Sequence, residues 1–216
     1  MKSNNISYIY GLMASDGYMV RRVGEKTGRV SYNAIIEVAE PQIIFDISDV
    51  VCAKPRYRSR IIASKVRHFW SLNIPKFVYG GNAECFLKHR YGLFNLYLGL
   101  SDKDSFIRGI FDGDGTVAET TDYRRKLRIG FSVNRECNDI MLILEHYASI
   151  NGITLSKYFD TRGNGSWFIS INRIDDVNKM FNLMYKNEPM LFLKRKYNRF
   201  ISHGFPDLVT SRKTIW

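Results

Sequence analysis

The stretch SFIRGIFDGDGTV, residues 105–117, decides the fold because an earlier stretch, SYIYGLMASDGYM at residues 7–19, repeats its outline. Each copy begins with Ser, has Gly four residues later and reaches an Asp-Gly pair. Residues four apart lie on one face of a helix, and small residues let two helix backbones approach closely. We therefore expect two helices, at 7–15 and 105–113, that pack against each other. Their small-residue faces are Ser7, Gly11 and Ser15, and Ser105, Gly109 and Gly113.

The Asp-Gly pairs then bring two carboxylates together. Asp16 and Asp114 would lie side by side at helix C-termini, which already carry a partial negative charge, and like charges repel. A divalent cation between them offsets both effects, and oxygen ligands favour Mg²⁺, Ca²⁺ or Mn²⁺ over Zn²⁺. A single Asp-Gly pair more often marks a simple turn after a helix. The repetition favours the metal site.

The remainder of the chain also reads as two copies. After each motif come two strand-like runs of period two, separated by a basic turn, then a helical pattern and two further strand-like runs. The closing segments FLKHRYGLF (86–94) and FLKRKYNRF (192–200) also match. The expected fold class is α+β, with two pseudo-symmetric αββαββα halves. The expected divisions are 1–95, a connector at 96–104, 105–200 and a tail at 201–216.

The composition restricts the partner and the compartment. The net charge is +11 and the pI is about 9.6, which favours a polyanionic partner, either nucleic acid or a membrane surface, over charge that serves solubility alone. No apolar run approaches the roughly 20 residues that span a bilayer, and the N-terminus lacks a signal-peptide pattern. The three cysteines form no CxxC pair. We expect an intracellular protein, cytoplasmic, organellar or nuclear according to its host and not secreted.

The motifs YGLMASDG and RGIFDGDG, with the αββαββα order of both halves, resemble the single-chain LAGLIDADG homing endonucleases over nearly the whole chain. The resemblance implies a saddle of antiparallel strands over the DNA major groove, with the motif helices at its centre. It implies a monomer with internal pseudo-two-fold symmetry that binds double-stranded DNA. The implied activity is site-specific, metal-dependent phosphodiester hydrolysis at a long asymmetric target, with Mg²⁺ as the cofactor and Mn²⁺ or Ca²⁺ able to occupy the site.

The resemblance also implies roles for single residues. Asp16 and Asp114 would bind the metal, with backbone carbonyls of Ser15 and Gly113 as further candidate ligands. The family has a second acid two residues before each metal ligand, which here is Asp112 in one copy but Ala14 in the other. The catalytic lysine of each FLK segment maps to Lys88 and Lys194. Glu40 and Arg135 are candidates for orienting the attacking water.

Basic residues at alternating strand positions are the candidate DNA contacts. Most would bind phosphates, and some would bind guanine edges. The first half contributes Arg21, Arg29, Arg56, Arg58, Arg60, Lys65 and Arg67, and the second contributes Arg124, Lys126, Arg128, Lys157 and Arg162.

Other functions explain the sequence less well. FDGDGT also fits a haloacid-dehalogenase-type phosphatase with Asp112 as nucleophile and Asp114 as acid/base, but the first copy has Ala14 at the nucleophile position. An EF-hand would need Gly at Val117, and no P-loop Gly-Lys-Ser/Thr follows the motif. An RNA maturase or a DNA-binding regulator on the same fold stays open as an alternative, although both motif acids are present.

Overall fold

The structure, a computed structural model, describes residues 2–62, 64–88, 90–119, 127–161, 165–187 and 189–209. Its first half runs α1 (Ser3–Ser15), β1 (Gly17–Val23), β2 (Val30–Val38), α2 (Pro41–Val51), β3 (Arg56–Ile62) and β4 (Lys65–Ile74), then α3 (Lys76–Tyr79) and the 3₁₀ helix η1 (Gly80–Phe86). The helix α4 (Leu93–Leu98) comes between the halves. The expected strands and helices of this half are therefore present, with its last helix reduced to short pieces.

The second half repeats this order. It runs α5 (Lys103–Asp114), β5 (Gly115–Glu119), β6 (Leu127–Asn134), α6 (Asn138–Ile150), β7 (Ser156–Asp160), β8 (Ser166–Ile171), α7 (Ile174–Tyr185) and α8 (Lys194–Ile201). The α+β fold class with two αββαββα halves is confirmed. Among the described residues, no helix is long and apolar enough to cross a membrane.

Each half has one antiparallel four-stranded sheet, in the order β1-β2-β4-β3 and β5-β6-β8-β7. Successive strand residues point to opposite faces, and one face of each sheet packs into the apolar core. Ile36 of β2 and Ile129 of β6, for example, are fully buried. We call the other face the open face. It carries Glu37, Phe69 and Arg58 on β2, β4 and β3, and Ser132, Phe168 and Tyr158 on β6, β8 and β7.

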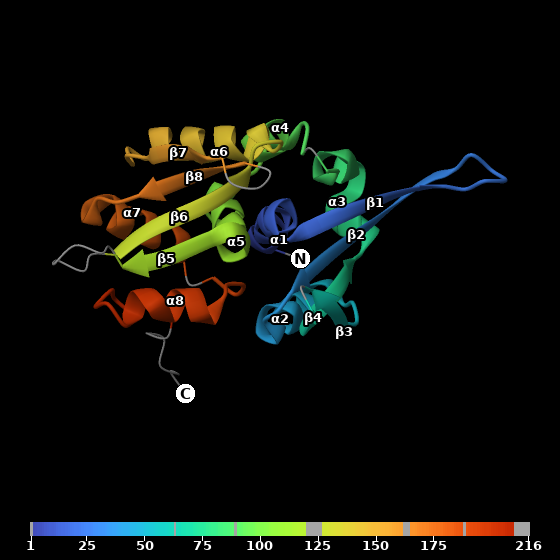
Figure 1. The fold of residues 1–216 in the computed structure, drawn as a ribbon, viewed down its shortest axis with the longest axis horizontal. Helices are drawn as coiled ribbons and strands as arrows, with labels where there is room; N and C mark the ends of the chain where they lie inside the picture. Colours follow the sequence, from blue (N-terminus) through green and yellow to red (C-terminus); the bar gives the residue numbers. More distant parts are fainter. Residues whose placement is uncertain are drawn as a thin grey trace.

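The motif helices α1 and α5 lie side by side at the centre, between the two sheets (Figure 1). Their contact is close because the seam is made of glycine and serine. A Cβ added to Gly11 would lie 1.9 Å from the Phe106 carbonyl oxygen, and one added to Gly109 would lie 2.2 Å from that of Tyr8. No side chain larger than hydrogen fits at these two positions. The expected packing of small-residue faces is therefore present.

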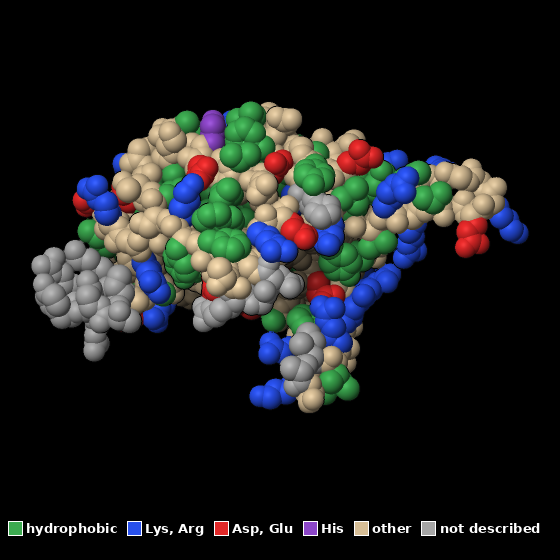
Figure 2. All heavy atoms as spheres, turned by 45° about the horizontal axis from the view of Figure 1, so that its top comes forward, with side chains coloured by type: hydrophobic (Ala, Val, Ile, Leu, Met, Phe, Trp, Pro, Cys, Tyr) green, Lys and Arg blue, Asp and Glu red, His purple; other side chains and the backbone are tan. Residues whose placement is uncertain are grey.

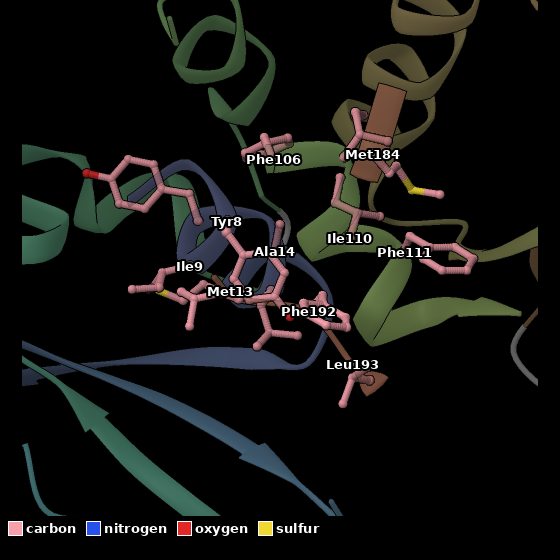
Figure 3. Close-up of a cluster of buried hydrophobic side chains, with 14 of the residues drawn as sticks. Tyr8, Ile9, Met13, Ala14, Phe106, Ile110, Phe111, Met184, Phe192 and Leu193 are labelled. Carbon is pink, nitrogen blue, oxygen red and sulfur yellow. The ribbon is translucent and has the colours of Figure 1, made fainter. Parts of the chain in front are cut away.

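Apolar side chains surround this seam and join the halves into one core. Figure 3 shows Tyr8 and Met13 of α1 close to Phe106 and Ile110 of α5, together with Leu193 from the segment before α8. All five side chains are buried. The close seam and the apolar side chains around it together fix the relative placement of the two helices. They therefore also fix the placement of the acidic residues at the C-terminal ends of the helices.

Candidate functional site

The two aspartates of the repeated motif meet at the ends of the central helices. Asp16 follows the last residue of α1, and Asp114 is the last residue of α5. Burial first, and then the neighbouring Asp114 carboxylate, raise the pKa of Asp16 to about 6. Burial also raises the pKa of Asp114. The structure therefore keeps two acids close together in surroundings that oppose their ionisation.

This electrostatic conflict predicts a pH-dependent gain from removing one acid. The pKa of Asp16 in the folded protein, about 6, lies above the ordinary aspartate value of 3.8. The stability that goes with protonated Asp16 is therefore lost as pH rises between these values. We expect Asp16→Asn to raise the free energy of unfolding at about pH 8 and to have little effect at about pH 4. Urea unfolding of both proteins at the two pH values tests this, and an equal gain at both would contradict it.

The residues at this site fit a divalent cation. A cavity of about 260 Å³ beside the helix ends is lined by Asp16, Glu37, Val38, Ala39, Glu40, Phe69, Asp112, Gly113, Leu193 and Arg195. The described residues contain no cluster of three or more acidic, His or Cys side chains that would enclose a metal by themselves. Two carboxylates and nearby carbonyls suit Mg²⁺, which keeps several waters and completes its shell with substrate phosphate oxygens.

A buried lysine, Lys196, holds the end of α5. Its ammonium group donates hydrogen bonds to the carbonyl oxygens of Phe111, Asp112 and Gly113, at 2.6, 2.7 and 3.1 Å. These carbonyls are otherwise the negative end of the helix dipole. Burial lowers the pKa of Lys196 to about 8, although the three motif aspartates act in the opposite direction.

Arg90 holds the C-terminal end of α1 in the same way. It is buried, and its guanidinium donates to the Ala14 carbonyl at 3.1 Å and the Gly17 carbonyl at 2.6 Å. The matched segments FLKHRYGLF and FLKRKYNRF place Arg90 and Lys196 at the same position, so each half supplies one cation to the end of its own motif helix. Both cations lower the pKa of Asp114, and Lys196 also lowers that of Asp16, which partly offsets the effect of burial.

The structure does not bring the predicted lysines to the aspartates. Lys88 is exposed and forms an ion pair with Glu136, at 3.5 Å. Lys194 is exposed, and its backbone N–H lies 3.5 Å from the Gln42 side-chain oxygen of α2. Arg90 and Lys196, which come two residues after Lys88 and Lys194, contact the ends of the motif helices, where the two lysines were expected. A catalytic role of Lys88 and Lys194 stays a prediction, and Arg90 and Lys196 are the cations that contact the helix ends.

A pair of variants separates the two lysines. We expect Lys196→Met to reduce the free energy of unfolding by about 2 kcal/mol, because three buried carbonyls lose a charged donor, and to reduce any metal-dependent cleavage strongly. Lys194→Met is the matched control and should change neither. Thermal unfolding and a cleavage assay measure both effects. Loss of activity in the Lys194 variant with a normal Lys196 variant would restore the original assignment.

Asp112, the second acid of its motif, is a structural residue. It is 1% exposed, and its Oδ2 accepts hydrogen bonds from the Tyr8 hydroxyl and the Leu193 backbone N–H, both at 2.8 Å. It thus joins α1, α5 and the segment before α8, and burial raises its pKa to about 6. A phosphatase nucleophile would stand exposed at a strand end, whereas this carboxylate is enclosed within a helix.

The two candidate water-orienting residues lie in different surroundings. Glu40, the residue before α2, lines the cavity beside Asp16 and forms an ion pair with Arg195 of α8. Arg135 is exposed in the turn after β6. Glu40 therefore has the better position, and its pairing with Arg195 also links the two halves.

The open face of the first sheet is strongly basic. Five predicted DNA contacts lie on it, namely Arg56, Arg58 and Arg60 on β3 and Lys65 and Arg67 on β4. Arg29 is exposed immediately before β2, and Arg128 lies on the open face of the second sheet. Figure 2 shows Lys and Arg side chains following the hollow between the projecting β1–β2 hairpin and the lobe below it. A phosphate backbone is the polyanion that suits such a surface.

Two predicted contacts lie on the other face. Arg21 is paired with Tyr32 and shares the face of Met19, which packs into the core. Lys157 is on the face of Ile169 and forms an ion pair with Glu145 of α6. These two expectations do not agree with the strand register, because a side chain one residue further along points the opposite way. Arg124, Lys126 and Arg162 lie outside the described residues.

Comparison with solved structures supports the fold. The chain is similar to the homing endonuclease I-WcaI bound to its DNA recognition sequence, with a TM-score of 0.66 and 15% identity over 91% of this chain and 85% of that one. It is similar to I-DmoI in complex with DNA and Ca, with a TM-score of 0.58 and 16% identity over 93% and 98%. Full-length DUF199/WhiA from Thermotoga maritima gives 0.53 and 13% over 99% and 62%.

Neither the protein-family models nor the curated proteins contain a match to the chain. The similarity is therefore one of fold, and it extends over both halves. The protein has the fold of the LAGLIDADG homing endonucleases, and its repeated motif stands where the two halves of that fold meet.

Proposed function

We propose that the protein is a site-specific, metal-dependent endonuclease of double-stranded DNA that acts as a monomer. The observation that carries this proposal is the meeting of Asp16 and Asp114 at the ends of the central helices, between two sheets whose open faces are free to contact a duplex. The similar structures add support, since they are of I-DmoI with DNA and Mn or Ca and of I-WcaI with its recognition sequence.

Each residue of the site has its own role in the proposed reaction. Bound Mg²⁺ would stabilise charge on the scissile phosphate and lower the pKa of a bound water. Asp16 and Asp114 would hold the ion, whose charge would offset the repulsion between them. Lys196 and Arg90 keep the two helix ends in place and supply positive charge nearby. Glu40 accepts hydrogen bonds at the edge of the cavity, where a water approaching the phosphate would lie.

The target is expected to be long and asymmetric because the open faces differ. The first carries a dense group of arginines and lysines. The described part of the second carries Arg128 together with Thr116, Gly130 and the contacting rings of Tyr158 and Phe168, whose centroids are 5.3 Å apart. Apolar groups of this kind suit the thymine methyl group. Each half therefore contacts a different DNA sequence.

The experiment is selection from duplexes with a long randomised centre. Purified protein is incubated with the pool in Mg²⁺, and cleaved ends are sequenced. In parallel, uncleaved complexes are recovered in Ca²⁺. The proposal expects one enriched sequence in both arms, and affinity that falls steeply between about 50 and 200 mM salt. Enrichment without cleavage in Mg²⁺ or Mn²⁺ would favour a DNA-binding regulator. Tighter binding of structured RNA than of any duplex would favour a maturase.

A further inference from the structure

Arg60 is the one described arginine of the basic open face whose side chain is held from two sides. It projects from the edge strand β3 and reaches across β4. Its guanidinium carbon lies 4.5 Å from the centre of the Phe69 ring. One terminal nitrogen donates to a carboxylate oxygen of Glu37 on β2. Arg58, its neighbour on the same strand and face, has no such contact among the interactions that the structure shows for its described residues.

Glu37 makes this arrangement rigid. Its side chain is only 8% exposed, whereas that of Arg60 is 58% exposed. A carboxylate that is almost buried is strongly destabilised when its charged partner leaves, so Glu37 keeps the guanidinium in place. The same Glu37 and Phe69 line the cavity beside Asp16. The guanidinium of Arg60 is thus held by two residues that line the cavity of the candidate site.

We propose that Arg60 recognises a guanine in the central part of the target, and that Glu37 and Phe69 are its positioning residues. Phosphate contact needs only charge, which a mobile side chain supplies. A guanine edge is recognised by two parallel N–H donors of a planar group in the major groove. The contact with Glu37 uses one terminal nitrogen, and stacking on Phe69 fixes the plane of the fork. The other donors of the guanidinium are left for the base.

The described residues of the second half show no such arrangement. The cross-strand pairs Gly17–Ile36 and Gly115–Phe131 align the two sheets, and this alignment places Ser132 at the position of Glu37. A serine hydroxyl holds no guanidinium by charge. We therefore expect this guanine preference near the cleavage site in the half-site that the first sheet contacts. This inference deepens the proposed function and depends on DNA being the ligand.

The test repeats the duplex selection with variants, and it reads sequence preference in the Ca²⁺ binding arm as well as cleavage. We expect Arg60→Ala and Arg60→Lys to lose a guanine preference of about ten- to a hundredfold at one central position. Glu37→Gln should weaken the same preference with little loss of affinity. Arg58→Ala is the matched control and should lower affinity for all sequences while every preference stays in place.

The outcomes separate this inference from the proposed function. An unchanged preference in Arg60→Ala, or full retention in Arg60→Lys, overturns the role of Arg60 while leaving the nuclease intact. A wild-type protein that enriches a guanine-containing sequence without cutting it overturns the nuclease and leaves Arg60 to be judged by its variants. Enrichment of no sequence overturns both. Thermal unfolding of each variant shows whether Glu37 without its charged partner has destabilised the fold. The double variant Glu37→Gln, Arg60→Ala is the comparison, because it removes both charges.

Discussion

Replacing either motif aspartate by asparagine is expected to abolish DNA cleavage while the protein remains folded. Asp16→Asn and Asp114→Asn each remove one of two negative ligands, and loss of the ion removes several kcal/mol of transition-state stabilisation, a rate loss of more than about a thousandfold. The second expectation is a gain in stability. Because both acids have raised pKa values, each variant should unfold at a higher temperature than the wild type near neutral pH.

The measurement combines cleavage of the selected target with thermal unfolding, with and without Mg²⁺. Asp49→Asn, which changes an exposed acid on α2, is the matched control and should leave rate and stability unchanged. Added Mg²⁺ should stabilise the wild type and fail to stabilise the two motif variants. Cleavage at the wild-type rate by either variant would show that the pair does not hold the catalytic ion. Destabilisation by both would show that the acids support the fold and do not strain it.

The helix seam and the sheets were predictable because their signals are local and periodic. Glycine and serine at spacing four define one face of a helix, and alternation of the kind seen at 30–38 defines one face of a strand. Both patterns depend only on burial, which dominates element formation. The placement of Asp16 beside Asp114 then followed from the packing, with no further information needed. The structure agrees at each of these points.

The cations at the helix ends were harder to predict because the repeat offers two matched basic positions. Lys88 matches Lys194, and Arg90 matches Lys196. The deciding signal is periodicity, since Lys196 lies three residues after Leu193 and four before Phe200, both buried. A lysine on an apolar helix face must satisfy its ammonium group inside the protein. The DNA contacts were hard to predict for a related reason. A strand register that is wrong by one residue assigns a side chain to the core face when it lies on the open face, or the reverse.

Adding a methyl group to the helix seam is expected to cause the largest loss of stability. In Gly11→Ala and Gly109→Ala the new carbon would meet backbone carbonyl oxygens, at 1.9 and 2.2 Å, and backbone cannot turn aside as a side chain can. The helices must separate or slide, and we expect a loss of about 3 kcal/mol or more, or roughly 10 °C in the melting temperature. Separation would also move the two aspartates apart, so metal-dependent cleavage should fall with stability.

Two further Gly→Ala variants allow the losses of stability to be ranked. Gly113→Ala would meet the Ser15 hydroxyl oxygen at 2.0 Å, which can rotate away, and the Ser15 Cβ at 2.6 Å, which needs a small shift of the helix end. A loss smaller than at the two backbone carbonyl contacts is therefore expected. Gly81→Ala meets no atom within 4 Å and should be neutral or slightly stabilising. Urea unfolding of the four variants should therefore rank Gly11 and Gly109 first, then Gly113, then Gly81. Equal and small effects at all four positions would mean that α1 and α5 do not pack along this seam, and the shared metal site that depends on their contact would not form.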